Sequence, residues 1–206
     1  MKNNEMPKKT GLAERKKKPA KLVFYYGTMN SSKSANLIMT AYNFSQQGKK
    51  FIALKSAKDT RDKEIKSRAL KLALPCIPIT SKEEIQAAVD KAKPDWVFCD
   101  ETQFMSPEMI DTLADIADNG TSVICYGLLT DFKGNLFPGS KRVVECADSI
   151  REIKNQCIYC ENKAIRNIRL VNNKPIFEGP LELPGDSYQS VCRKCYQEEK
   201  QKTVGE

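Results

Sequence analysis

Short apolar segments alternate with amphipathic segments over residues 21–126 of this 206-residue chain. Runs of mostly apolar residues predict buried strands, whereas apolar residues that recur every three or four positions predict helices with one buried face. We expect strands at residues 21–26, 51–54, 96–100 and 121–126, and helices at residues 34–47, 81–92 and 106–120. This alternation predicts an α/β fold in which helices cover both faces of a parallel sheet.

Capping signals mark the ends of the expected helices. Gly48 is a natural stop for the first helix, and Ser81 and Glu84 have the spacing of a capping box. Ser106 and Pro107 supply an N-cap and a first-turn proline for the third helix. Beyond these elements the pattern changes to short polar segments, which predicts a second, smaller unit. The expected organisation is a tail over 1–19, an α/β domain over 20–150, a small domain over 151–196 and a C-terminal tail over 197–206.

The formal net charge of +8 is concentrated at the N-terminus, where residues 1–19 contain seven Lys or Arg and two Glu. This segment has no apolar periodicity, which predicts a disordered tail. Because the rest of the chain is only mildly basic, we expect no specific nucleic-acid partner. No apolar stretch has the form of a secretory signal or the length of a bilayer span. Four of the eight cysteines are isolated, as is typical of reduced core residues, so we expect a cytoplasmic protein without a membrane partner.

Residues 27–34 connect the first expected strand to the first expected helix, which is where a phosphate-binding loop must lie. In such a loop, backbone N–H groups point at phosphate oxygens, the lysine neutralises them and the hydroxyl after it binds Mg²⁺. A loop lysine of no special purpose is the alternative interpretation. The candidate phosphate-binding residues are Gly27, Thr28, Met29, Asn30, Ser31, Ser32, Lys33 and Ser34. Ser32 stands where the pattern has glycine, so strain of about 1 kcal/mol or more is expected there.

Asp100 and Glu101 follow an apolar strand, at the edge of the sheet where the phosphate loop also lies. We expect Asp100 to hold Mg²⁺, together with Ser34, and Glu101 to accept a proton from a hydroxyl. The chain contains no histidine, which leaves a carboxylate as the base. Arg61, just beyond the second strand, could reach the same edge and neutralise the transferring group. The alternative is that the two carboxylates mark a solvated turn.

Two cysteine pairs, each with two intervening residues, lie in the C-terminal part of the chain. Cys157 and Cys160 form the first pair, and Cys192 and Cys195 form the second. Four thiolates predict a closed, structural zinc site, with redox dithiols or disulfides as the alternatives. The metal would restrain residues 161–191, which could then close over a substrate.

Several apolar or aromatic residues are expected near the same edge of the sheet and could recognise a flat base. They are Met29, Phe104, Leu128, Phe132 and Tyr188.

Taken together, these motifs resemble the type II thymidine kinases, the zinc-containing family, over about residues 21–196. The resemblance rests on the segments 25–34, 57–61, 100–104, 125–134 and 187–196 and on both cysteine pairs. It implies a P-loop α/β domain with a small zinc-binding lasso domain, and ATP-dependent, Mg²⁺-dependent phosphorylation of the 5′-hydroxyl of thymidine or deoxyuridine. A homotetramer and feedback inhibition by thymidine triphosphate are also implied.

The resemblance also assigns roles by position. Glu101 matches the proton acceptor, and Lys33 and Ser34 match the ligands of phosphate and Mg²⁺. Phe132 matches the aromatic residue that stacks on thymine. Met29, Phe104 and Leu128 match residues that line the pocket, Gly185 and Tyr188 lie in the lasso loop that binds the base, and Asp100 and Gln103 border the phosphates.

Three positions depart from the family pattern: Ser32, the shorter lasso over 183–188, and Asn167, where relatives often carry a small hydroxyl or apolar residue. Two other functions remain open from the sequence. One is a nucleotide-binding protein with little kinase activity because of Ser32, and the other is a zinc-ribbon nucleic-acid binder with an ATPase-like domain.

Overall fold

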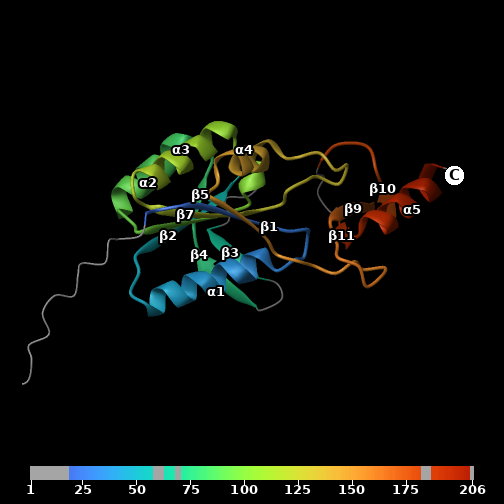
Figure 1. Ribbon diagram of the computed structural model, residues 1–206, viewed down its shortest axis with the longest axis horizontal. Helices are drawn as coiled ribbons and strands as arrows, with labels where there is room; N and C mark the ends of the chain where they lie inside the picture. The colour runs from blue at the N-terminus through green and yellow to red at the C-terminus, as the bar shows by residue number, and fades with distance from the viewer. Residues whose placement is uncertain (1–18, 58–62, 68–70, 182–186, 205–206) are drawn as a thin grey trace, which may run out of the picture.

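Six parallel strands form the central sheet of the computed structural model, which describes residues 19–57, 63–67, 71–181 and 187–204 (Figure 1). Their order across the sheet is β5-β2-β6-β7-β1-β8. The bounds are β1 Leu22–Tyr26, β2 Phe51–Ser56, β5 Ile77–Ile79, β6 Trp96–Asp100, β7 Ser122–Gly127 and β8 Ser149–Glu152. Every pairing between neighbours is parallel, which confirms the predicted fold class.

Helices cover both faces of this sheet (Figure 1). α1 (Lys33–Gln46) lies on one face, and α2 (Lys82–Ala92), α3 (Pro107–Asp118) and α4 (Pro138–Cys146) lie on the other. Successive strand residues alternate between the two cores, as the two-residue period of a strand requires. Val97 packs in the core with α2 and α3, whereas Phe98 packs in the core with α1.

The predicted helix starts are confirmed by their hydrogen bonds. Ser81 Oγ accepts the backbone N–H of Glu84 at 3.3 Å, and Ser106 Oγ accepts that of Met109 at 3.3 Å. The Glu84 carboxylate accepts the N–H of Thr80, one residue before the position expected for a capping box. These side chains satisfy donors that a helix N-terminus otherwise leaves without intrahelical partners.

Several short elements of the α/β domain were not predicted. They are β5, α4, β8 and the antiparallel hairpin of β3 (Glu64–Ser67) and β4 (Leu72–Pro75), which lies against α1. β8 pairs with β1 through Arg151 and Glu152, so the central sheet continues past the domain boundary expected at residue 150.

A three-stranded antiparallel sheet, ordered β10-β9-β11, forms a separate C-terminal unit with α5 (Figure 1). The bounds are β9 Arg166–Val171, β10 Lys174–Ile176, β11 Ser187–Val191 and α5 Arg193–Val204. Its small core combines apolar side chains with the four paired cysteines. α5 continues beyond residue 196 into the segment expected as a tail.

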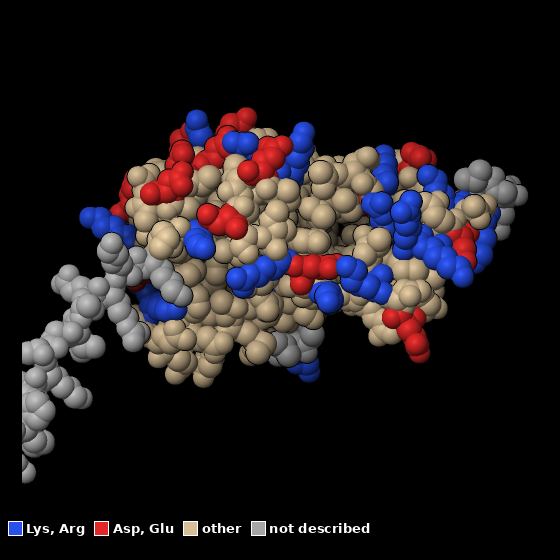
Figure 2. Space-filling model, viewed as in Figure 1, with Lys and Arg blue, Asp and Glu red and all other residues tan. Residues whose placement is uncertain are grey.

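Charge is unevenly distributed over the face seen in Figure 2. Acidic side chains gather over α2 and α3, and basic side chains gather over the C-terminal unit (Figure 2). Within the part of the chain that the structure describes, we find no helix with the length and apolar character needed to cross a membrane.

Candidate active site

The loop over residues 27–34 joins the end of β1 to the start of α1 at the carboxyl edge of the sheet. Lys33 is the first residue of α1, and its Nζ donates back to the carbonyl of Thr28 at 2.7 Å and to that of Gly27 at 3.4 Å. Burial lowers the pKa of Lys33, while the charges of Glu101 and Asp100 raise it. The lysine is therefore held beside both carboxylates that the sequence placed at this edge.

Ser32 has the backbone conformation that the loop pattern assigns to glycine. Its φ of 64° and ψ of 27° lie in the left-handed region, and its side chain is exposed and makes no capping hydrogen bond to α1. The chain thus forms the expected turn with a residue for which that turn is strained. The strain predicted from the sequence therefore has a structural basis.

Asp100 lies at the end of β6, directly beside the loop. Ser34 Oγ donates to Asp100 Oδ2 at 3.3 Å, and Asp100 is only 4% exposed. Burial, and secondly the charge of Glu101, raises the pKa of Asp100 to about 7. A hydroxyl and a carboxylate next to a phosphate loop are oxygen donors of the kind that Mg²⁺ takes in P-loop proteins, so these two residues fit a Mg²⁺ site.

Glu101 is in a left-handed conformation, with φ of 54°, at the turn between β6 and the short helix η1 (Thr102–Phe104). Strained residues of this kind cluster at functional sites. Gln103 holds the glutamate: its Nε2 donates to Glu101 Oε2 at 2.5 Å, and its Oε1 accepts the Leu128 N–H at 3.1 Å. The carboxylate is therefore oriented by a buried amide that is itself fixed to the backbone after β7.

Because Gly127 has no side chain, it leaves room for the side chains of Thr102 and Gln103. A Cβ built on Gly127 would lie 2.8 Å from both Gln103 Oε1 and Thr102 Oγ1. Any side chain at this position would displace the residues that follow Glu101.

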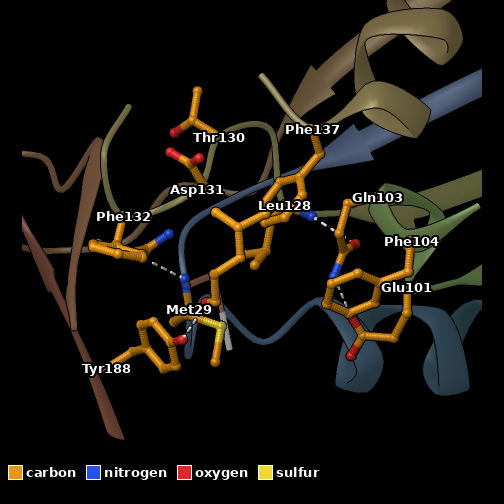
Figure 3. A pocket seen from close by; sticks show the side chains of 12 residues that line it. Met29, Glu101, Gln103, Phe104, Leu128, Thr130, Asp131, Phe132, Phe137 and Tyr188 are labelled. Carbon is orange, nitrogen blue, oxygen red and sulfur yellow. Dashed lines mark hydrogen bonds between the residues drawn. The ribbon is translucent and has the colours of Figure 1, made fainter. Parts of the chain in front are cut away.

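Glu101 also lines a cavity of about 150 Å³ between the central sheet and the C-terminal unit (Figure 3). The side chains around it come from the 27–34 loop, from η1, from the segment after β7 and from the C-terminal unit. They are Met29, Glu101, Gln103, Phe104, Leu128, Thr130, Asp131, Phe132, Phe137, Asn167, Leu181 and Tyr188. The mixture of aromatic and apolar walls with a few polar groups is typical of a pocket for a small organic ligand.

The structure thus brings together residues that the sequence analysis proposed separately. Of the residues proposed to bind the base, Met29, Phe104, Leu128, Phe132 and Tyr188 all line the cavity. Gln103, proposed to border the phosphates, contacts Glu101 and also lines the cavity. Arg61 and Gly185 lie outside the described residues. The roles of these residues remain predictions.

The C-terminal unit holds Met29 through contacts that were not predicted from the sequence. The Met29 N–H donates to Asn167 Oδ1 at 2.9 Å, and the Met29 carbonyl accepts from Asn155 Nδ2 at 3.2 Å and from Ser190 Oγ at 2.5 Å. These partners are 126 to 161 residues away along the chain. No local pattern marks such contacts, so only the folded structure reveals them.

The four paired cysteines converge in the C-terminal unit. Their Sγ atoms all lie within 4.8 Å of one another, and the Sγ of Cys160 is 3.7 Å from the Sγ atoms of Cys192 and Cys195. A tetrahedral zinc ion with Zn–S bonds of about 2.3 Å would separate its ligands by about 3.8 Å. The cluster therefore has the donor set and spacing of a structural zinc site.

A parallel α/β sheet with a phosphate loop, two carboxylates beside it and an adjoining cavity defines the class of P-loop nucleotide-binding proteins. A family model described as thymidine kinase matches residues 20–196. The thymidine kinase of Streptococcus pyogenes serotype M3 is 39% identical over 183 residues, which cover 86% of this chain and 97% of that protein. The thymidine kinase of Streptococcus agalactiae serotype Ia is 38% identical with the same coverage. The chain therefore belongs to the thymidine kinase family, and it is a kinase that uses ATP.

Proposed function

We propose that this enzyme, a phosphotransferase with an alcohol as acceptor, transfers the γ-phosphate of ATP to the 5′-hydroxyl of thymidine or deoxyuridine. The observation that carries the proposal is the position of Glu101, which lines the organic-ligand cavity while its charge acts on Lys33 of the phosphate loop. Phosphoryl transfer needs this adjacency, because the acceptor hydroxyl must lie in line with the terminal phosphorus.

Each group then has a defined part in the transfer. The 27–34 loop holds the triphosphate through its backbone N–H groups, and Lys33 neutralises the phosphate oxygens. Glu101 accepts the proton of the 5′-hydroxyl as that oxygen bonds to the γ-phosphorus and ADP leaves. Ser34 and Asp100 would hold Mg²⁺, which would supply charge stabilisation of the phosphates when bound. Arg61 is assigned to the transferring group from the sequence motif alone.

The cavity walls support a nucleoside acceptor. Phe132 offers an aromatic face for the base, Met29, Phe104 and Leu128 surround it with apolar surface, and Tyr188 completes the C-terminal side. Gly185 is assigned to base binding from the sequence alone. The cysteine cluster would hold a structural zinc ion that orders this side of the pocket.

The wider assignments follow from the family and the sequence. We place the enzyme in the cytoplasm, as a homotetramer inhibited by thymidine triphosphate, with an N-terminal tail, a P-loop domain and a zinc-binding lasso domain that is followed by the continuation of α5. Because β8 pairs with β1, we place the boundary between the two domains after Glu152.

The test is an assay of the purified protein with ATP and Mg²⁺, in which each deoxynucleoside is offered separately and the product is identified by mass spectrometry. We expect deoxythymidine monophosphate from thymidine and no product from purine deoxynucleosides. ATP hydrolysis without any nucleoside monophosphate would contradict the proposal.

A further inference from the structure

The turn that carries Phe132 is fastened to the C-terminal unit. Within the turn, Asp131 Oδ1 accepts the N–H groups of Lys133 and Asn135, each at 2.9 Å, and this fixes its internal shape. The turn is bonded to the C-terminal unit at two places: the Gly134 carbonyl accepts from Arg166 Nη1 at 3.4 Å, and the Phe132 carbonyl accepts the hydroxyl of Tyr196 at 2.7 Å. The second bond joins residues that are 64 positions apart along the chain.

Tyr196 is rigidly held in a position from which it can make this bond. It directly follows Cys195, and its N–H donates to the carbonyl of Cys192 at 3.0 Å in the first turn of α5. The residue is 6% exposed, and its ring meets that of Phe177 edge-on, with 5.3 Å between the ring centroids. The hydroxyl therefore projects from the cysteine cluster toward the Phe132 turn and has little freedom to move.

Arg169 acts on the same residue through the ring. It is 2% exposed, its guanidinium carbon lies 5.5 Å from the Phe132 ring centroid, and its Nη1 donates to the Pro180 carbonyl at 2.6 Å. A buried guanidinium is costly unless it is hydrogen-bonded, and a cation over an aromatic face is an attractive contact. Phe132 is thus held by its backbone through Tyr196 and by its ring through Arg169.

We propose that Tyr196 is a positioning residue for the nucleoside pocket. Its hydroxyl fixes Phe132, the aromatic wall of the pocket, relative to the cysteine cluster. The inference rests on the proposed function, because it takes Phe132 as the residue that stacks on the base. Tyr196 does not line the cavity. The hydrogen bond described for its hydroxyl goes to Phe132 and not to the 27–34 loop. Loss of the hydroxyl should therefore weaken nucleoside binding without weakening ATP binding.

The test is the substitution Tyr196→Phe, which removes the hydroxyl and keeps the ring packed against Phe177. Tyr159→Phe is the matched control, because Tyr159 lies in the same unit, its hydroxyl donates to Gln189 Oε1 at 2.6 Å, and it does not line the cavity. We expect Tyr196→Phe to raise the KM for thymidine by about two- to tenfold, the effect of one hydrogen bond. The kcat, the KM for ATP and the zinc content should stay at wild-type values, and Tyr159→Phe should change none of these quantities.

A double-mutant cycle with Phe132→Ala shows whether Tyr196 acts through the ring. If it does, adding Tyr196→Phe to Phe132→Ala produces no further rise in the KM for thymidine. An unchanged KM in Tyr196→Phe overturns the inference, and so does an equal further rise in the double mutant. A parallel change in kcat and in both KM values, or a loss of zinc, also overturns it, because Tyr196 would then be a general structural residue.

The cycle separates failure of this inference from failure of the proposed function. If Phe132→Ala itself leaves the KM for thymidine unchanged, then Phe132 does not stack on the base, and that part of the proposed function is wrong. If Phe132→Ala raises the KM and Tyr196→Phe does not, the pocket assignment stands and only the positioning role of Tyr196 is lost.

Discussion

Replacing Ser32 by glycine should stabilise this enzyme, although the substitution removes a side chain and makes no new contact. Ser32 adopts φ of 64° and ψ of 27°, and its exposed side chain makes no capping hydrogen bond. A residue with a Cβ in the left-handed region is strained by about 1–2 kcal/mol. Glycine removes this strain because it populates the same region freely.

The effect of glycine on the unfolded state reduces this gain in the free energy of unfolding. Glycine makes the unfolded chain more flexible, which lowers the free energy of unfolding by about 0.4–1 kcal/mol. The net expectation is an increase of about 0.5–1 kcal/mol in the free energy of unfolding. For a domain of this size, that corresponds to a rise of roughly 1–4 °C in Tm.

Ser32→Ala is the control that isolates the backbone effect. Alanine also lacks the hydroxyl but retains the Cβ, so it keeps the left-handed strain. Because no capping bond is lost, Ser32→Ala should stay within about 0.5 kcal/mol of the wild type. Urea denaturation of the three proteins, followed by circular dichroism, measures the difference.

The glycine variant should also retain activity. The loop already has the backbone angles that a glycine would take, so phosphate binding requires no rearrangement, and we expect a KM for ATP no higher than that of the wild type. Equal stability of the glycine and alanine variants would refute the strain argument. A lower kcat in the glycine variant would show that the Ser32 side chain takes part in turnover.

Three further predictions concern the cavity and the cysteine cluster. Glu101→Gln, which is nearly isosteric, should keep thymidine binding in calorimetry but lower kcat by about 10²-fold or more, the contribution of a general base; an unchanged kcat would exclude that role. Gly127→Ala should lower the free energy of unfolding by about 1–3 kcal/mol in urea denaturation, because its Cβ would lie 2.8 Å from Gln103 Oε1 and Thr102 Oγ1; wild-type stability would show that both side chains move freely. Elemental analysis should find about one zinc per chain, with a loss in Cys160→Ser and a lower Tm; a folded, metal-free wild type would contradict the zinc site.

The sequence was sufficient where a pattern is local and strong. β6 was predicted with the bounds that the structure has, and β1, β7 and the first three helices were placed to within a residue or two. Each of these elements has either a continuous apolar run or a capping residue. β8 has neither, because Ile150 is the single apolar residue in the strand. Ile150 is also 45% exposed in the structure. Its assignment depends on pairing with β1, more than 120 residues earlier, which no local pattern records.

In the candidate site, too, local features were predicted from the sequence and long-range contacts were not. The sequence placed Asp100 and Glu101 at one edge of the sheet, but it did not indicate how two adjacent carboxylates face different neighbours. The left-handed turn at Glu101 achieves this: Asp100 meets Ser34 of the loop, whereas Glu101 is turned to Gln103 and the cavity. A single strained residue thus separates the proposed metal side from the proposed acceptor side. The two residues that follow it, Thr102 and Gln103, are bonded to β7 and to the segment directly after it, which are distant in the sequence.

The C-terminal unit contacts both halves of the site, and by different residues. Asn155, Asn167 and Ser190 hold the backbone of Met29 in the phosphate loop, whereas Tyr196 holds the backbone of Phe132 in the cavity wall. Loss of the metal should loosen the whole unit and therefore weaken the binding of ATP and thymidine together. Loss of the Tyr196 hydroxyl leaves the Met29 contacts in place and should weaken thymidine binding alone. The C-terminal unit that holds the cysteine cluster is thus connected by one set of contacts to the phosphate loop and by another to the cavity wall.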